Sequence, residues 1–221
     1  MNTTIRLLTP LVCLSVPICQ ANVINGDFAG GLASWVSTGD VSAPPGYARL
    51  GDNGQVYSLL YQGVPLATGD YTLDFDFKNA LSLTAPGAQT LPDVHFASLY
   101  FINDMGQFNL GANQFDLGVP LFDMDSVGVY NNHGTITASP LGPDWLHFAL
   151  AFTNNHAYAI PTFEFFDLNF IDNDSAVLID NVRIGVVTRT VTEPASYLLL
   201  TVGLLSLSLL HRHARHDKLG I

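Results

Sequence analysis

The 221-residue sequence contains little cysteine and little positive charge. Its two cysteines, Cys13 and Cys19, both lie near the N-terminus, so the rest of the chain has no disulfide with which to fasten its loops. The chain has eight Lys and Arg residues and 19 Asp and Glu residues, which gives a formal net charge of −11. Such a chain repels a phosphate backbone, so we predict no nucleic-acid partner. It attracts divalent cations.

The sequence also lacks recognisable catalytic motifs. It has no Gly-x-Ser-x-Gly, no His-Glu-x-x-His and no phosphate-binding glycine loop. A glycosidase needs two carboxyl groups at a defined separation. Glu164 and one of the aspartates could form such a pair, but the sequence alone does not place them together. The prediction is therefore a protein that is not an enzyme.

The N-terminal segment, residues 1–21, has the layout of a secretory signal peptide. One base, Arg6, precedes an apolar run over residues 7–18, and Ala21 ends a small-x-small sequence. Such a segment directs export, here through the Sec translocon, and is removed after its last small residue. We therefore expect the mature chain to begin at Asn22. A noncleaved anchor is the alternative, although this apolar run is short for a bilayer span.

The C-terminal segment predicts one transmembrane helix. Residues 195–210 carry no charge, and eight of these 16 residues are leucine. A helix of this length reaches roughly 24 Å, somewhat short of a hydrocarbon core of about 30 Å. Arg212, Arg215 and Lys218 follow in the tail 211–218. Because such bases stay on the cytoplasmic side, the body of the chain is expected outside.

The short polar motif 192–194, the apolar helix and the basic tail together resemble the PEP-CTERM sorting signal of Gram-negative bacteria. Glu193 and Pro194 match that signal residue by residue, whereas Thr192 stands where the signal has its first proline. The resemblance implies processing by exosortase in a species that makes exopolysaccharide. It implies transient anchoring in the inner membrane through 195–210, followed by residence at the cell surface or in the biofilm matrix. A plain single-pass anchor is the alternative.

The body, residues 22–191, reads as β-strands. Residues 71–77 and 146–152 alternate between apolar and polar side chains, which is the period of a half-buried strand. Residues 94–102 are apolar on both faces and predict a central strand, and residues 177–187 predict the last strand. Residues 163–171 lose this phase at two adjacent phenylalanines, which predicts a bulge.

Turn-forming sequences separate these runs, and no stretch of the body keeps a helical period for three turns. The predicted fold is therefore all-β, an antiparallel β-sandwich of one domain. The body has four bases and 17 acids, so its formal charge is −13.

Three short pieces of the body resemble galactose-binding-like jelly rolls, a group that includes many carbohydrate-binding modules. They are residues 25–35 (NGDFAGGLASW), Gln62 with residues 69–73 and Phe75, and residues 178–182 (LIDNV). The resemblance implies a jelly-roll sandwich, and it supports the fold more than a function because one fold carries many functions.

Asp180 is the acid of greatest interest in the predicted last strand. Strict alternation places it on one face with Leu178, Val182 and Ile184, where a carboxylate without a partner is costly. It therefore needs a partner. One reading is that Asp180 caps a backbone amide or sits at a bulge.

The other reading of Asp180 comes from the resemblance. In the resembling modules this aspartate and the N-terminal loop hold a structural calcium. Asn25, Asp27 and Asp180 are accordingly the predicted calcium ligands, since calcium takes six to eight oxygens. At the family's glutamate position this chain has Ala29.

A sugar-binding site needs an exposed aromatic face beside amide groups. Tyr130 and Asn132 in one predicted turn, and Tyr158 beside another, have that composition and are the candidate ligand-binding residues. The resulting prediction is an exported, exosortase-sorted surface or matrix protein that is non-catalytic and binds polysaccharide. A cell-envelope glycoside hydrolase or other hydrolase is one alternative, and a purely structural surface protein without a ligand is another.

Overall fold

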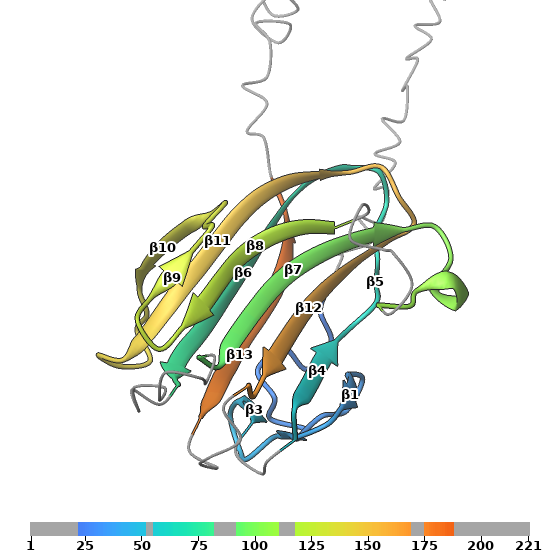
Figure 1. Ribbon diagram of the computed structural model, residues 1–221. Helices are drawn as coiled ribbons and strands as arrows, with labels where there is room; N and C mark the ends of the chain where they lie inside the picture. The colour runs from blue at the N-terminus through green and yellow to red at the C-terminus, as the bar shows by residue number, and fades with distance from the viewer. Residues whose placement is uncertain (1–21, 52–54, 82–91, 111–117, 169–174, 188–221) are drawn as a thin grey trace, which may run out of the picture. The chain divides into compact units, whose positions relative to one another are not determined.

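The computed structural model describes residues 22–51, 55–81, 92–110, 118–168 and 175–187. In these residues the chain forms two antiparallel β-sheets that lie face to face, as Figure 1 shows. The predicted all-β, antiparallel sandwich is therefore confirmed.

The first sheet is built from strands that lie far apart in the sequence. In spatial order these are β1 (Val36–Thr38), β4 (Tyr57–Tyr61), β12 (Tyr158–Phe166), β7 (Val94–Ile102), β8 (Gly118–Asp125) and β9 (Val129–Tyr130), with the short β5 (Val64–Pro65) also pairing with β12. The predicted central strand, residues 94–102, is β7, which pairs with β12 on one side and β8 on the other.

The second sheet holds the two long strands that show the clearest alternation. In spatial order it contains β10 (Thr135–Ala138), β11 (Trp145–Asn154), β6 (Gly69–Ala80), β13 (Ala176–Val186), β3 (Ala48–Gly51) and β2 (Val41–Ser42). In β6 the alternation holds as predicted, because Tyr71, Leu73, Phe75 and Phe77 are all buried.

Aromatic side chains from both sheets fill the space between them. Phe75 of β6 meets Phe163 of β12 edge to face, with ring centroids 5.0 Å apart. Phe77 of β6 lies 4.7 Å from Phe122 of β8. These contacts join the two sheets, and all four rings are fully buried. Each such ring contributes a large apolar surface to the core.

The predicted bulge at Phe165-Phe166 is wrong. Strand β12 keeps a regular register with both β4 and β7 as far as Phe166, where it ends. The two phenylalanines point to opposite faces. Phe165 is fully buried in the core, whereas Phe166 contacts Tyr57 and Phe96 on the other side of the sheet. The sequence lost its apparent phase because the outer face of β12 also carries an aromatic residue, Phe166.

Asp180 shares a face with Leu178 as predicted, but the expectation that Val182 and Ile184 share that face is wrong. The register between β13 and β6 shifts between Asp180 and Arg183, and Asn181 adopts a left-handed backbone with φ 53°. An asparagine tolerates this conformation better than most residues. The bulge sends Val182 and Ile184 into the core and turns Asp180 away from it, which agrees with the bulge reading of that residue.

Helix is nearly absent from the part of the chain that the structure describes. One short 3₁₀ turn, Met105–Gln107, begins where the Asp104 side chain accepts a hydrogen bond from the Gly106 N–H. No described helix is long and apolar enough to cross a bilayer. The predicted membrane helix 195–210, the sorting residues Glu193 and Pro194, and the cleavage residue Ala21 all lie outside the described residues.

Candidate functional site

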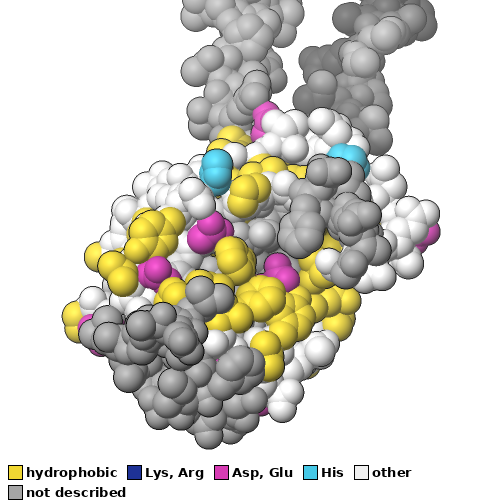
Figure 2. Space-filling view, viewed as in Figure 1, with side chains coloured by type: hydrophobic (Ala, Val, Ile, Leu, Met, Phe, Trp, Pro, Cys, Tyr) yellow, Lys and Arg dark blue, Asp and Glu magenta, His cyan; other side chains and the backbone are white. Residues whose placement is uncertain are grey.

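The outer face of the first sheet carries aromatic and acidic side chains together. Alternation turns Tyr57, Leu59 and Tyr61 of β4 outward, because Ser58 and Leu60 point inward and are fully buried. Strand β12 lies directly beside β4, with Leu59 opposite Glu164 and Tyr57 opposite Phe166. Figure 2 shows apolar side chains gathered across this face with acidic groups among them.

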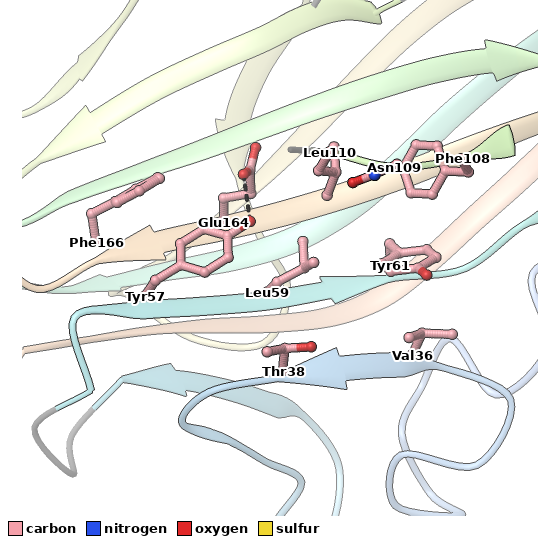
Figure 3. A pocket seen from close by; sticks show the side chains of 10 residues that line it. All are labelled: Val36, Thr38, Tyr57, Leu59, Tyr61, Phe108, Asn109, Leu110, Glu164 and Phe166. Carbon is pink, nitrogen blue, oxygen red and sulfur yellow. Dashed lines mark hydrogen bonds between the residues drawn. The ribbon is translucent and has the colours of Figure 1, made fainter. Parts of the chain in front are cut away.

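A groove of about 490 Å³ runs over β4 and β12 on this face. We call it the aromatic groove. Its aromatic lining residues are Tyr57, Tyr61, Phe108 and Phe166, and Glu164 also lines it. Figure 3 shows Tyr57 and Phe166 at one end, Tyr61 and Phe108 at the other, and Glu164 between them.

The rings at each end of the aromatic groove support one another. Tyr57 and Phe166 lie 4.9 Å apart between ring centroids, and Tyr61 and Phe108 lie 4.9 Å apart in an edge-to-face arrangement. Four residues along a strand separate Tyr57 from Tyr61, which corresponds to roughly 13 Å. The groove thus presents two rigid aromatic ends with a polar group between them.

Glu164 is the polar centre of the groove. Its side chain is almost buried, at 8% exposure, and Oε1 accepts a hydrogen bond of 2.7 Å from the Tyr57 hydroxyl. Burial raises the pKa of Glu164 above its usual value, although the Tyr57 hydrogen bond opposes that rise. The pKa of Tyr57 is raised in turn, first by burial and then by its bond to Glu164. This pair keeps the carboxyl group fixed at the groove floor.

A second cavity, of about 370 Å³, lies beside the aromatic groove and shares Glu164 and Phe166 with it. Its other lining residues include Phe96, Tyr100 and Asp123. Asp123 accepts a hydrogen bond of 2.5 Å from Asn131 Nδ2. Phe96 lies between the two acids, since it is paired with Glu164 on one side and with Asp123 on the other. Two carboxyl groups therefore face one cavity.

The structure separates the three predicted sugar-binding residues. Tyr130 is 45% exposed and sits beside Asp123 at the β9 edge of the first sheet. Asn132 is exposed, and its side chain accepts a hydrogen bond from the Gly134 N–H within its own turn. Tyr158 lies at the opposite end of β12 from Glu164, packed in a small apolar cluster with Ile102. They do not form one site.

Sequence reasoning missed Tyr57, Tyr61 and Phe166, which line the aromatic groove. The signal was present in Tyr57-Ser-Leu-Leu-Tyr61, where the tyrosines and Leu59 fall on one face by alternation. What the sequence does not show is that this short strand lies next to β12, about 100 residues further along the chain.

The predicted calcium ligands lie around the bulge of β13. Strand β13 meets the N-terminal loop where the Val182 N–H donates to the Gly26 carbonyl oxygen. Asp180 accepts a hydrogen bond of 2.6 Å from the Asn181 N–H, so the capping reading of this residue is confirmed. Burial raises the pKa of Asp180 to about 6, and the nearby carboxylates of Asp76 and Asp27 add to the rise.

Asn25, the third predicted calcium ligand, organises the N-terminal loop. Its side chain holds the N-terminal loop together, with Oδ1 accepting from the Gly30 N–H and Nδ2 donating to the carbonyl oxygens of Gly31 and Ala33. Within the described residues, no group of three or more His, Cys, Asp or Glu side chains is placed to hold a metal ion. The calcium site stays a prediction that depends mainly on Asp27 and Asp180.

The outer face of the second sheet carries a polar network around Asp76. Unlike Glu164 in the aromatic groove, Asp76 has both carboxylate oxygens bonded by protein groups. Asp76 accepts from Asn181 Nδ2 at 2.8 Å and lies 3.0 Å from His147 Nδ1. Asp76 is buried at 3% exposure beneath these partners. Its two carboxylate oxygens are thus both occupied by protein groups, which points to a structural role.

The comparisons with known proteins show solved structures with a similar fold. No family profile and no curated protein matches the sequence. The fold is similar to the enzymatically active domain of tailspike protein 4 of bacteriophage CBA120, with 17% identity and a TM-score of 0.46, over 76% of this chain and 21% of that one. This chain therefore spans about a fifth of that domain's length.

Two smaller structures are similar over most of their own length. One is TmCBM61, solved in complex with β-1,4-galactotriose, with 13% identity and a TM-score of 0.43 over 73% of this chain and 95% of that one. The other is the CBM22-1 xylan-binding domain of Xyn10C from Paenibacillus barcinonensis, with 12% identity and a TM-score of 0.41 over 75% and 94%. Both are carbohydrate-binding modules.

Proposed function

We propose that this domain binds a carbohydrate chain in the aromatic groove and acts without catalysing a reaction. The observation that supports this most strongly is the pair of aromatic ends, Tyr57 with Phe166 and Tyr61 with Phe108, on either side of the nearly buried Glu164. Sugar rings have apolar faces that pack on aromatic rings and hydroxyl groups that bond to polar side chains. The groove offers both kinds of contact.

The size and openness of the groove suit a short segment of a longer polymer. Its volume of about 490 Å³ falls within the range of small-molecule sites, roughly 300–1,000 Å³. The groove lies on the surface of a sheet and not inside the sandwich.

The test is retention of the full chain, purified in mild detergent, on a panel of polysaccharides, with affinity then measured for those that bind. Tyr61→Ala removes one aromatic end and should weaken binding by about tenfold, which corresponds to about 1.4 kcal/mol. Tyr47→Ala is the matched control. Tyr47 is also half-buried and lies against one aromatic ring, Trp145, but it precedes β3 of the second sheet. Its loss should leave the affinity unchanged.

If no polysaccharide is retained, or if both variants bind as well as the unaltered protein, the groove is not the site. The protein would then be better described as a structural surface component.

A second candidate function, glycoside hydrolysis, is favoured by one observation. Glu164 and Asp123 face a shared cavity, and burial raises the pKa of Glu164, as a general acid requires. Their strands stand two positions apart in the sheet, so their Cα atoms are separated by roughly 10 Å. Inverting glycosidases place their carboxyl groups about 6.5–9.5 Å apart.

Incubation with each retained polysaccharide distinguishes the two functions. A hydrolase would release reducing ends, and Glu164→Gln would stop the release. We expect no release, because Asp123 already accepts a bond from Asn131 and Tyr57 already occupies one oxygen of Glu164.

We also propose that the chain is exported and sorted by exosortase to the cell surface or extracellular matrix of a Gram-negative bacterium. The support is the sequence pattern at its two ends, with Ala21 as the last residue of the signal peptide and Glu193-Pro194 before the apolar segment 195–210. The test measures the mass and the cellular fraction of the mature protein, with and without residues 192–221. A native protein in the cytosol with both ends intact would contradict it.

A further inference from the structure

Charge is divided unevenly between the outer faces of the two sheets. The described bases are Arg49, Lys78 and Arg183, which lie on β3, β6 and β13, all in the second sheet. No described strand of the first sheet contains Lys or Arg. Figure 2, which views this sheet from outside, shows acidic side chains and two histidines but no Lys or Arg among the described residues.

The internal segments outside the described residues do not alter this division. Residues 52–54, 82–91, 111–117 and 169–174 contain neither Lys nor Arg. Wherever these segments lie, they cannot supply a guanidinium or an ammonium group to a ligand on the first sheet. Neither the described residues of this face nor the four internal segments therefore offer the usual means of binding a carboxylate or a sulfate, a charge-assisted bond from Arg or Lys.

Glu164, on the same face, is suited to a ligand that donates hydrogen bonds. Oε1 of Glu164 accepts from Tyr57. Its other carboxylate oxygen has no hydrogen-bond partner among the described residues, and Glu164 lines both cavities. An ionised carboxylate only accepts hydrogen bonds. A hydroxyl, an amide N–H or an ammonium group can satisfy that oxygen, whereas a second carboxylate cannot.

The nearly buried position of Glu164 strengthens this selection. Two like charges repel each other more strongly where water is excluded, because the effective dielectric constant is lower. Burial alone already makes the charged form of Glu164 less favourable, as its raised pKa indicates. A uronic acid placed in the groove would add a second unfavourable charge, and Asp123 would add to the repulsion from the neighbouring cavity.

Building on the glycan-binding function proposed above, we propose that the aromatic groove selects uncharged and amino-bearing glycans and excludes polyanionic polysaccharides. The ligand class is then a neutral hexose or pentose polymer, or a partly deacetylated amino-sugar polymer whose ammonium group lies against Glu164. Uronic-acid polymers such as alginate are outside the class.

The experiment compares four probes with the full chain at pH 6.0, where the amino groups of chitosan are mostly protonated: β-1,4-galactan, xylan, chitosan oligosaccharide and alginate. Each is measured at ionic strengths of about 0.01 M and about 0.15 M, where the Debye length falls from about 30 Å to about 8 Å. We expect a neutral glycan to bind with an affinity that changes less than twofold between the two salt conditions. Chitosan should bind about tenfold more tightly at low salt, and alginate should not bind at either.

Matched variants separate the groove from the overall charge of the protein. Glu164→Gln and Asp144→Asn each remove one negative charge, but Asp144 lies at the second sheet, where it pairs with Lys78 at 2.9 Å. Glu164→Gln should abolish the salt-dependent preference for chitosan. Asp144→Asn should keep that preference.

The outcomes keep this inference distinct from the proposed function. Alginate binding as tightly as a neutral glycan would overturn the selectivity and leave glycan binding in place. Equal effects of Glu164→Gln and Asp144→Asn would also overturn it, because the net charge of the protein and not the groove would then set the preference. Failure of all four probes to bind would overturn both proposals.

Discussion

The two sheets share one core but differ in how completely their outer acidic groups are bonded by the protein. In the second sheet, Asp76 is bonded to both Asn181 and His147, so its oxygens are satisfied by protein groups. In the first sheet, Glu164 lines the groove and has one oxygen that no described residue bonds. Closed networks of this kind stabilise a fold, whereas an open polar group in a groove is available to a ligand.

His95 is a core residue that bonds to the backbone of Glu164, whose side chain lines the aromatic groove. Its Nδ1 lies 2.8 Å from the backbone oxygen of Glu164. Since a carbonyl oxygen only accepts, Nδ1 carries the proton in the neutral ring. The ring lies within the core beside Phe122 and Phe163, and it thereby helps to hold the backbone of β12 at the groove floor.

The largest expected effect concerns His95. Burial lowers its pKa to about 4 from an ordinary value of 6.5. The unfolded chain therefore takes up a proton first, so the stability contribution is complete above pH 6.5 and is lost as the pH falls through 4. The loss should reach roughly 3 kcal/mol. Urea unfolding between pH 7 and pH 4 measures it, and His95→Gln should remove this part of the pH dependence. An unchanged slope in the variant would contradict the assignment.

The closed network of the second sheet is tested by Asp76→Ala. Removing the carboxylate takes the acceptor from His147 and leaves the part-buried Asn181 amide only its longer bond of 3.4 Å to Asp180, which should cost about 2 kcal/mol in the free energy of unfolding. Glycan affinity should not change, since Asp76 lies on the opposite sheet from the groove. Glu164→Gln should show the reverse, with altered binding and little loss of stability. A loss of affinity in Asp76→Ala would remove the contrast between the sheets.

Asp180 provides a pH effect of opposite sign to that of His95. Because its pKa is raised to about 6 from 3.8, its contribution to stability is complete below pH 3.8 and is lost as the pH rises through 6. Asp180→Asn should therefore be more stable than the unaltered protein at pH 7 and equally stable at pH 3.5. Asparagine keeps the acceptor for the Asn181 N–H. Equal stability at pH 7 would refute the prediction.

The predicted calcium site gives a further measurement on the same residue. A cation between Asp27 and Asp180 would relieve the repulsion that raises the pKa of Asp180. Calcium should then raise the thermal midpoint by about 3 °C for each kcal/mol gained. The shift should disappear with EDTA and in Asp180→Asn. No shift, or an equal one in the variant, would exclude these two residues as calcium ligands.

The smallest effect is expected at the ion pair between Lys78 and Asp144. The two side chains are 29% and 69% exposed and 2.9 Å apart. Such surface pairs contribute about 0–1 kcal/mol. Lys78→Met should change the urea midpoint little and should leave affinity for neutral glycans unaltered. A large loss of binding would mean that the second sheet takes part in recognition.

The sequence predicts best where one face of a strand is polar. Tyr71 to Phe77 in β6 and Leu146 to Phe152 in β11 alternate as their solvent-facing positions require, and both strands were predicted correctly. In β12 the outer face carries the apolar Phe166 next to Glu164, because this face forms part of the groove, and the same reasoning produced a bulge that is not there. The face that carries the aromatic groove was thus the region where the sequence pattern misled.

The sequence by itself determined that the body is made of strands with an acidic, disulfide-free composition, because local alternation and charge depend only on neighbouring residues. Tertiary structure decided that Tyr57 lies beside Phe166 and that Asp180 turns away from the core. Pairing between strands 100 residues apart depends on how the whole apolar surface is buried, and no local pattern encodes that choice.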